Sequence, residues 1–225
     1  MTFERVTILA LLLVLVVVLL RPRQAVSIEL PNTPSQNGQG DRPAVAGGDI
    51  LAAIHSRKSV RRYTDEPVSL EELHTLVRAG FAAPSGANKQ PWEFVVVTER
   101  ERLDAMSRLL VWGKMLDKAP AAIVVCSNLR TIEDDIAVKL SMLDCAAACE
   151  NILLAAEGTG LGAVWCAAYP YDENVAGIRK IAELPEEIIP VAVISVGRPT
   201  GADRPKNKYK PEKIHLQRWG DSFPE

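Results

Sequence analysis

The sequence predicts a layered α+β fold for residues 48–225, with a central mixed or antiparallel sheet and long helices. Short apolar runs rich in Val and Ala have the length of buried strands, and longer segments with helical spacing separate them. Long helices between few strands favour layers packed around one core, and a hydrophobic content of 48% is ample to fill it. The predicted strands are residues 92–98, 121–127, 163–168 and 191–197.

Two capping boxes mark helix starts in this domain. Ser69 and Glu72 form the pattern S-x-x-E, which opens a helix reaching about residue 82, and Thr98 with Glu101 repeats the pattern before the next helix. The remaining boundaries follow from apolar spacing and from Gly at the helix ends. The other predicted helices are residues 49–56, 132–158 and 174–184.

The helix predicted over residues 132–158 is dense in small side chains, with the stretch LDCAAACENILLAAEGTG at its end. Such a surface suits either the central core helix of one subunit or a helix shared across a dimer interface. Cys145 and Cys149 are four residues apart on it, but the chain has no Cys-x-x-Cys pair. Buried Cys behaves as a small apolar residue. The sequence therefore predicts neither a metal site nor a disulfide framework.

A dense basic cluster stands out in a chain that is nearly neutral. There are 26 Lys and Arg against 28 Asp and Glu, so the formal net charge is −2. A general nucleic-acid-binding domain would show a broad basic surface, and none is predicted. Yet four of the six positions from Arg57 to Arg62, within IHSRKSVRRYTDEPV, are basic. The cluster is either a solvated turn or a site for one small anion.

Residues 1–25 are predicted to be a membrane anchor or signal segment outside the folded domain. Residues 6–20, VTILALLLVLVVVLL, are almost wholly apolar, and Arg21 and Arg23 follow at once. The run is shorter than the roughly 20 residues of a comfortable span, so a cleaved secretory signal also fits. The two Arg favour an uncleaved anchor and, by the positive-inside rule, a cytoplasmic catalytic domain, with export as the alternative. Residues 26–47, rich in Pro, Gly, Asn and Ser, are predicted to be a flexible linker.

The segment from Gly158 to Ala163 matches the G-x-G-x-x-A form of a dinucleotide-binding fingerprint. That fingerprint follows a strand and opens a helix, whereas this segment closes a predicted helix and opens a strand. It is interpreted as a helix C-cap and turn. The three His residues are scattered, so no catalytic acid or base is predicted.

Residues 83–97, APSGANKQPWEFVVV, pass from a polar loop directly into a predicted strand. Together with RKSVRRY at residues 57–63, this loop resembles the nitroreductase family of FMN-dependent enzymes. Lys118-Ala-Pro120, the long helix with its Gly-rich turn, and the tail at residues 197–219 agree with the order of motifs in that family. The resemblance covers nearly all of residues 49–219, and it implies a homodimer whose sites lie across the subunit interface.

The resemblance also implies roles for the basic residues. Arg57 and Ser59 would hold the FMN phosphate, with Lys58 beside them, because charge-assisted hydrogen bonds are the strong ones. Arg61 matches a basic residue near the pyrimidine edge of the flavin. Lys206 and Lys208 match a pair of basic residues that closes over the phosphate from the tail. The family more often has Arg at the second of these positions, where this chain has Lys208. The implied cofactor-binding set is Arg57, Lys58, Ser59, Arg61, Pro84, Ser85, Asn88, Gln90, Ala167, Ala168, Lys206 and Lys208.

Two parts of that set complete the expected site. Ser85 and Asn88 would reach the flavin from the partner subunit. Ala167 and Ala168 occupy the loop expected near flavin N5, where some family members carry Glu-Gly, so any contact there would come from backbone N–H groups.

The implied activity moves hydride from NADH or NADPH through FMN to a small acceptor, such as a nitroaromatic or a quinone, by a ping-pong scheme. No catalytic side chain is required, because the chemistry belongs to the cofactor. One alternative is reductive dehalogenation of an iodotyrosine-like substrate; those enzymes use a longer lid carrying Glu, Tyr and Lys than the segment at residues 100–118. The other is a non-catalytic, membrane-tethered flavin redox module.

Overall fold

The computed structural model describes residues 47–132 and 134–224. The predicted anchor or signal segment lies outside these residues, and so does the predicted linker except for Gly47. Within the two described ranges, no helix is both long enough and apolar enough to cross a membrane.

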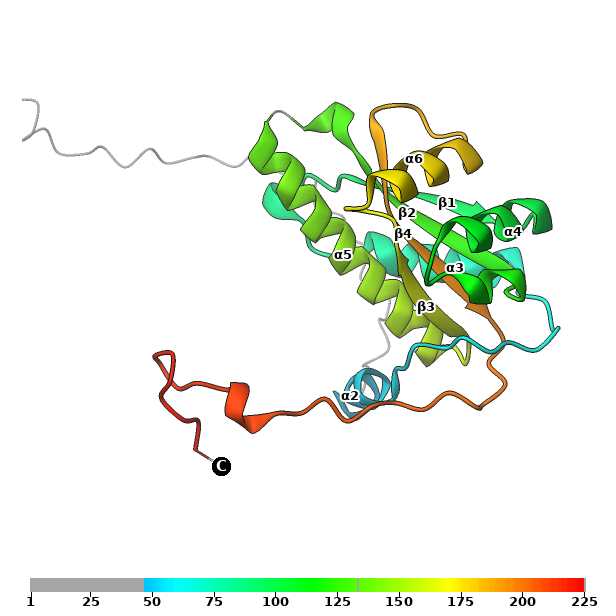
Figure 1. The fold of residues 1–225 in the computed structure, drawn as a ribbon. Coiled ribbons are helices and arrows are strands. Elements are labelled where there is room, and N and C mark those ends of the chain that lie inside the picture. Colours follow the sequence, from blue (N-terminus) through cyan, green and yellow to red (C-terminus); the bar gives the residue numbers. More distant parts are fainter. Residues whose placement is uncertain (1–46, 133, 225) are drawn as a thin grey trace, which may run out of the picture. The chain divides into compact units, whose positions relative to one another are not determined.

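The centre of the fold is a four-stranded sheet in the order β1-β2-β4-β3. Its strands are β1 (Trp92–Val97), β2 (Ala121–Asn128), β3 (Gly162–Ala167) and β4 (Ile188–Gly197). Each neighbouring pair runs antiparallel, so the antiparallel one of the two predicted arrangements is the one observed. The predicted α+β class is confirmed (Figure 1).

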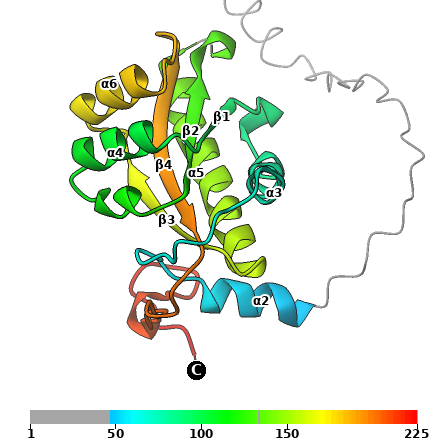
Figure 2. The same cartoon turned by 90° about the vertical axis from the view of Figure 1, so that its right-hand side faces the viewer.

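Helices cover both faces of the sheet, as Figure 2 shows. On one face lie α3 (Leu70–Phe81) and α5 (Asp135–Gly158), whose buried side chains share one apolar cluster with the sheet. On the other face lie α4 (Arg100–Leu109) and α6 (Asp172–Ile181), which pack in a second cluster. The short helix α2 (Gly47–Ser56) lies beside the C-terminal end of α5.

The two apolar clusters explain why the central strands are continuous apolar runs in the sequence. In β2, Ile123 and Val125 belong to the cluster under α5, whereas Ala122, Val124 and Cys126 belong to the cluster under α4 and α6. Successive side chains of a strand point to opposite faces, so a strand covered on both sides must be apolar at every position.

The first predicted capping box is confirmed and the second is wrong. Ser69 Oγ accepts a hydrogen bond from Glu72 N at 3.2 Å, and Glu72 Oε2 accepts one from Ser69 N at 2.9 Å. The bonds from Ser69, with help from Arg198, hold the pKa of Glu72 below its usual value. At the start of α4 the cap residue is Glu99, not Thr98, and no side chain caps the helix. The Glu99 carboxylate instead pairs with Arg102 at 2.7 Å.

Other boundaries shift by a few residues. The long helix α5 begins at Asp135 rather than at residue 132, because Asp134 is its cap and accepts a hydrogen bond from Ala137 N at 2.7 Å. A short 3₁₀ turn, η3 (Leu129–Thr131), precedes it. At the C-terminal end of α5, Gly160 has φ of +76° and Leu161 N donates to Ala156 O at 2.8 Å. The interpretation of residues 158–163 as a helix C-cap and turn is therefore confirmed.

Candidate functional site

Residues 57–63, here called the basic segment, lie against the start of β3. Ser59 forms a parallel bridge with Ala163, and Val60 N donates to Ala163 O at 3.0 Å. The Val60 side chain is buried, with an exposed fraction of 1%. Because side chains alternate along an extended segment, burying Val60 leaves Ser59 and Arg61 on the outer side.

The C-terminal tail is fastened to the same segment. Asp203 accepts hydrogen bonds from the Arg61 backbone N–H at 3.1 Å and from the Arg62 guanidinium at 3.2 Å. Arg62 also donates to Ala202 O at 3.0 Å. Burial by itself would raise the pKa of Asp203, but the bonds from Arg61 and Arg62 outweigh it and hold that pKa below its usual value. Arg62, which lies outside the cofactor-binding set implied by the resemblance, therefore holds the tail against this segment.

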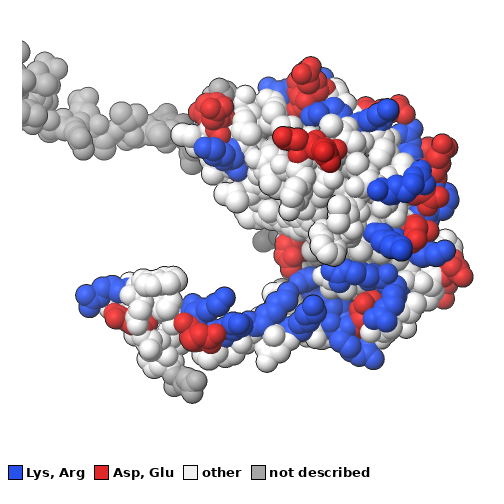
Figure 3. Space-filling view, viewed as in Figure 1, with Lys and Arg blue, Asp and Glu red and all other residues white. Residues whose placement is uncertain are grey.

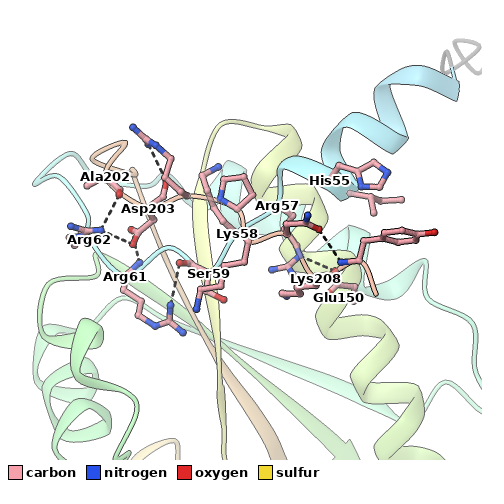
Figure 4. A pocket seen from close by; sticks show the side chains of 16 residues that line it. His55, Arg57, Lys58, Ser59, Arg61, Arg62, Glu150, Ala202, Asp203 and Lys208 are labelled. Atoms are coloured by element: carbon pink, nitrogen blue, oxygen red, sulfur yellow. Dashed lines mark hydrogen bonds and ion pairs between the residues drawn. The ribbon is translucent and has the colours of Figure 1, made fainter. Parts of the chain in front are cut away.

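Between the segment and the tail lies a pocket of about 860 Å³, here called the basic pocket (Figure 4). It brings together six of the predicted residues: Arg57, Lys58, Ser59, Arg61, Lys206 and Lys208. Seven Lys or Arg residues line it, against two carboxylates, Glu150 and Asp203. Figure 3 shows Lys and Arg side chains gathered where the tail leaves the body of the domain.

Three of the cations already have acidic partners: Arg62 with Asp203, as described above, and Arg57 and Lys58 with carboxylates of one helix. Arg57 Nε lies 3.1 Å from a Glu150 carboxylate oxygen, and Lys58 Nζ lies 2.9 Å from Glu157 on the same helix, α5. Among the described residues, Lys206 and Lys208 form no ion pair, and Ser59 Oγ has no hydrogen bond. The basic pocket thus keeps a surplus of positive charge and one half-buried hydroxyl with no protein partner, which suits an anion carrying several oxygens.

The predicted polar loop lies elsewhere. Pro84, Ser85, Asn88 and Gln90 do not line the basic pocket. Gly86 N–H, at the centre of this loop, donates to Asp144 of α5 at 3.0 Å. Asp144 precedes Glu150 by six residues, a rise of about 9 Å along the helix axis.

The loop holds an unusual backbone. Ala87, Asn88 and Gln90 have φ of 48°, 56° and 49°, in the left-handed region that non-Gly residues seldom occupy. Gln90 N donates to Ser85 Oγ at 3.0 Å, and the Gln90 amide donates to Asn88 Oδ1 at 2.8 Å. Conformations of this kind cluster at ligand-binding sites.

Ala167 and Ala168 lie at the C-terminal end of β3. Ala167 is exposed, whereas Ala168 is fully buried, falls just outside the strand, and donates its N–H to Val191 O at 3.1 Å. Ala167 and Cys166 line a second hollow of about 420 Å³. Burial raises the pKa of the Cys166 thiol to about 11, and the charge of Arg61 offsets only part of this effect.

Two acidic residues of the basic pocket were missed. Asp203 stands in the tail motif GRPTGAD, and its place in a tail already expected near the anion could have marked it. Glu150 lies 93 residues from Arg57 along the chain, and their contact depends on how α5 crosses the sheet. No local pattern predicts such a contact. In the described parts of the chain no group of His, Cys, Asp or Glu could hold a metal ion.

Fold and pocket together define an α+β domain with a cationic pocket beside an antiparallel sheet. The family model "Nitroreductase family" matches residues 54–113 and 104–198. A protein of Methanothermobacter thermautotrophicus assigned as an NADH dehydrogenase/NAD(P)H nitroreductase is 39% identical over 173 residues, which cover 76% of this chain and 88% of that protein. The chain belongs to the nitroreductase family.

Solved structures agree with this result. A crystal structure of a Parabacteroides distasonis protein assigned as an NADH dehydrogenase/NAD(P)H nitroreductase has a TM-score of 0.72 and 46% identity, covering 76% of this chain and 98% of that one. A protein of Desulfovibrio desulfuricans assigned as a nitroreductase, solved in complex with FMN, has a TM-score of 0.64 and 28% identity. Its match covers 82% of this chain and 100% of that one.

Proposed function

We propose that this protein is an FMN-dependent oxidoreductase that uses NADH or NADPH to reduce a small acceptor. The proposal rests on the basic pocket of a nitroreductase-family chain. In this pocket Lys206 and Lys208 of the tail meet Arg57, Lys58, Ser59 and Arg61. When bound, FMN would supply the redox chemistry, which is transfer of hydride from a nicotinamide to a nitroaromatic or a quinone in a ping-pong scheme. The protein supplies binding, orientation and charge.

Arg57 and Ser59 hold the phosphate end of FMN in this proposal. The ion pair with Glu150 positions the Arg57 guanidinium, and the bridge to β3 fixes the Ser59 backbone, so less ordering is required on binding. Lys206 and Lys208 close over the phosphate from the tail, and Lys58 adds charge beside it. Preorganised, charge-assisted donors suit a phosphate that carries between one and two negative charges.

Arg61 is proposed to lie near the flavin ring of FMN. The basic segment meets the start of β3 where Ser59 bridges Ala163, and it then crosses toward Pro199, the bridge partner of Tyr63. The strand advances about 13 Å over the four residues from Ala163 to Ala167, which is the order of length needed between the phosphate and the ring of FMN. Arg61, between these ends, would stabilise negative charge on the reduced ring, and the exposed Ala167 backbone would border it.

A second copy of the chain completes the proposed site. Pro84, Ser85, Asn88 and Gln90 do not line the basic pocket of their own subunit, so we assign them to the pocket of a partner. The loop that carries them touches an apolar face of α5, since a Cβ placed on Gly86 would lie 3.9 Å from Leu140. A partner that covers this face would bring its own loop to the site.

One face of α5 carries exposed apolar side chains that a partner subunit would bury. Ile136, Leu140 and Leu143 recur with helical spacing and are 68%, 44% and 66% exposed. The tail, which extends away from the body in Figure 1, adds Tyr209 at 70% and Trp219 at 91% exposure. Several exposed apolar side chains on one helix face are typical of an interaction site, and a homodimer would cover both copies at once.

The deiodinase alternative has less support. The segment at residues 100–118 holds α4, a tight turn and the 3₁₀ helix η2 (Lys114–Asp117), and it has no Tyr. Turnover of iodotyrosine with release of iodide would favour that alternative. A non-catalytic redox module would instead bind flavin and fail to oxidise NADH rapidly with any small acceptor.

The membrane anchor remains part of the proposal. Arg21 and Arg23 follow the apolar run, and the positive-inside rule favours a catalytic domain in the cytoplasm, where reduced nicotinamide is supplied, over an exported one. A reporter fused after Glu225 tests this placement. Fluorescence of fused GFP supports it, whereas activity of fused alkaline phosphatase means that the domain is exported.

The central experiment uses residues 45–225, which form one compact unit. The purified fragment should be yellow, with the absorption spectrum of a flavin. Anaerobic NADH or NADPH should bleach it, and a quinone or nitroaromatic should restore the colour. A colourless fragment that binds no added FMN, or a flavin that neither nucleotide reduces, contradicts the proposed function.

A further inference from the structure

The hollow beside Ala167 is built from three segments on the α6 side of the sheet. It is lined by the turn at residues 110–112, the end of β3 at residues 166–167 and the start of α6 at residues 171–174. Its volume of about 420 Å³ lies within the range of small-molecule sites. We call it the Trp112 hollow.

The turn that forms one wall is held in place although its side chains are exposed. Val111 and Trp112 are 80% and 85% exposed. Gly113 N donates to Leu110 O at 2.8 Å, and a Cβ on Gly113 would lie only 2.6 Å from Leu110 Cβ, so Gly closes this turn. The Cys166 thiol lies 3.7 Å from Trp112 O. A fixed turn thus presents a large apolar ring that has little protein to pack against.

The opposite wall is acidic. Asp172 and Glu173 are exposed in the first turn of α6, and no Lys or Arg lines the Trp112 hollow. The helix N-terminus carries about half a positive charge, which offsets only part of two carboxylates. The buried Cys166 thiol stays neutral at physiological pH, because burial raises its pKa to about 11. The residues that line the hollow therefore carry a net negative charge.

The basic pocket and the Trp112 hollow are lined by residues of opposite net charge. The basic pocket suits the phosphate, whereas the Trp112 hollow, at the proposed ring end of FMN, suits a flat apolar molecule without negative charge. We propose that the Trp112 hollow binds the acceptor and selects planar neutral or cationic acceptors over anionic ones. This inference rests on the proposed function, since it places the acceptor beside the flavin ring near Ala167.

The reaction at this position is balanced for a quinone or for a nitroaromatic. A quinone takes up the hydride from NAD(P)H and one proton from solvent to give a quinol and NAD(P)⁺. A nitro group takes up the same two electrons and two protons in all, and it loses one oxygen as water to give a nitroso group. Neither reaction needs a further oxidant or reductant.

The test compares three acceptors with the same ring and different charge: 4-nitrobenzoate, 4-nitrobenzyl alcohol and (4-nitrobenzyl)trimethylammonium. kcat/KM is measured for each with the FMN-saturated full chain in detergent, without oxygen and at low ionic strength. The variants are Asp172→Asn with Glu173→Gln, and Glu71→Gln as the matched control. Glu71 is also an exposed acid in the first turn of a helix, α3, but it does not line the hollow.

The expected order in the wild type is cation, then neutral, then anion. The double variant should lower the ratio of kcat/KM for the cation to that for the anion about tenfold, and Glu71→Gln should leave it unchanged. Comparing variant with wild type cancels the different intrinsic reactivities of the acceptors. A ratio that does not respond to the double variant, or a wild type that prefers the anion, overturns the inference. If no acceptor is reduced at all, the proposed function itself has failed.

Trp112 supplies an independent check. Trp112→Ala should lower kcat/KM about two- to tenfold for all three acceptors, with unchanged FMN content, and Trp112→Phe should recover most of the loss. Equal kcat/KM for Trp112→Ala and the wild type with every acceptor would show that the acceptor binds elsewhere.

Discussion

Val60 lies directly over Gly162, where the basic segment crosses the start of β3. A Cβ placed on Gly162 would lie 2.5 Å from Val60 Cγ1 and 2.8 Å from Val60 Cβ. Gly162 pairs across the sheet with Gly197, and a Cβ there would lie 2.7 Å from Tyr63 Cδ1. Two facing glycines therefore leave the space that the basic segment occupies.

Gly162→Ala should both destabilise the protein and weaken FMN binding. Overpacking at a well-packed site costs roughly 1–3 kcal/mol, and relief requires the segment with Arg57 and Ser59 to move away from the sheet. Urea unfolding and flavin titration measure the two effects. Gly158→Ala is the control, because a Cβ there meets nothing within 4 Å. Identical stability and FMN affinity in the Gly162→Ala variant and the wild type would contradict this packing argument.

Arg57→Ala should weaken FMN binding without unfolding the domain. Hydrogen bonds to charged groups contribute about 1.5–3 kcal/mol, so the Kd should rise roughly 10- to 150-fold. Fluorescence titration of the apoprotein measures it. Arg78→Ala, which removes an exposed Arg in the last turn of α3, should leave the Kd unchanged. An Arg57→Ala protein that retains FMN with wild-type affinity removes Arg57 from the site.

Most of the fold could be predicted from the sequence because its signals are local. Strands buried on both faces are continuous apolar runs, and the box at Ser69 and Glu72 is completed within four residues. The box at Thr98 failed because the helix begins one residue later than the pattern requires: Glu99 occupies the cap position, and its carboxylate pairs with Arg102. A pattern of residue types does not reveal which partner a side chain will choose.

The candidate site was less accessible to sequence reasoning. Arg57 to Arg62 stand out by their density, and six residues of the predicted set do line one pocket. The contacts of Arg57 with Glu150, and of Arg62 with Asp203, join residues 93 and 141 positions apart. Such contacts depend on the packing of α5 and on the path of the tail, which no short motif specifies.

Asp203→Asn should loosen the tail in a pH-dependent way. The folded pKa of Asp203 lies below the unfolded value of about 3.9. Its stabilising contribution is therefore fully present above that unfolded value and is lost as the pH falls through the folded pKa. At pH 7, trypsin should cut the variant faster than the wild type after Lys206 and Lys208.

The pH series supplies the decisive comparison for Asp203. The difference in free energy of unfolding between wild type and Asp203→Asn should persist down to about pH 4 and shrink below it. Asp65→Asn is the control, since Asp65 is exposed and forms no ion pair among the described residues. A difference that stays constant to pH 2 would mean that Asp203 acts through something other than its charge.

Leu143→Glu should both dissociate the proposed dimer and lower its affinity for FMN. Leu143 is 66% exposed on the apolar face of α5, near the loop that a partner is proposed to contribute. Two carboxylates buried against each other across a two-fold interface would be costly to desolvate, so the variant of residues 45–225 should sediment as a monomer. Because Ser85 and Asn88 would no longer reach a second chain, FMN affinity should fall with it. Leu70→Glu, at a position 72% exposed on α3, should remain a flavin-loaded dimer. A Leu143→Glu monomer that binds FMN as tightly as the wild type would show that one chain builds the whole site.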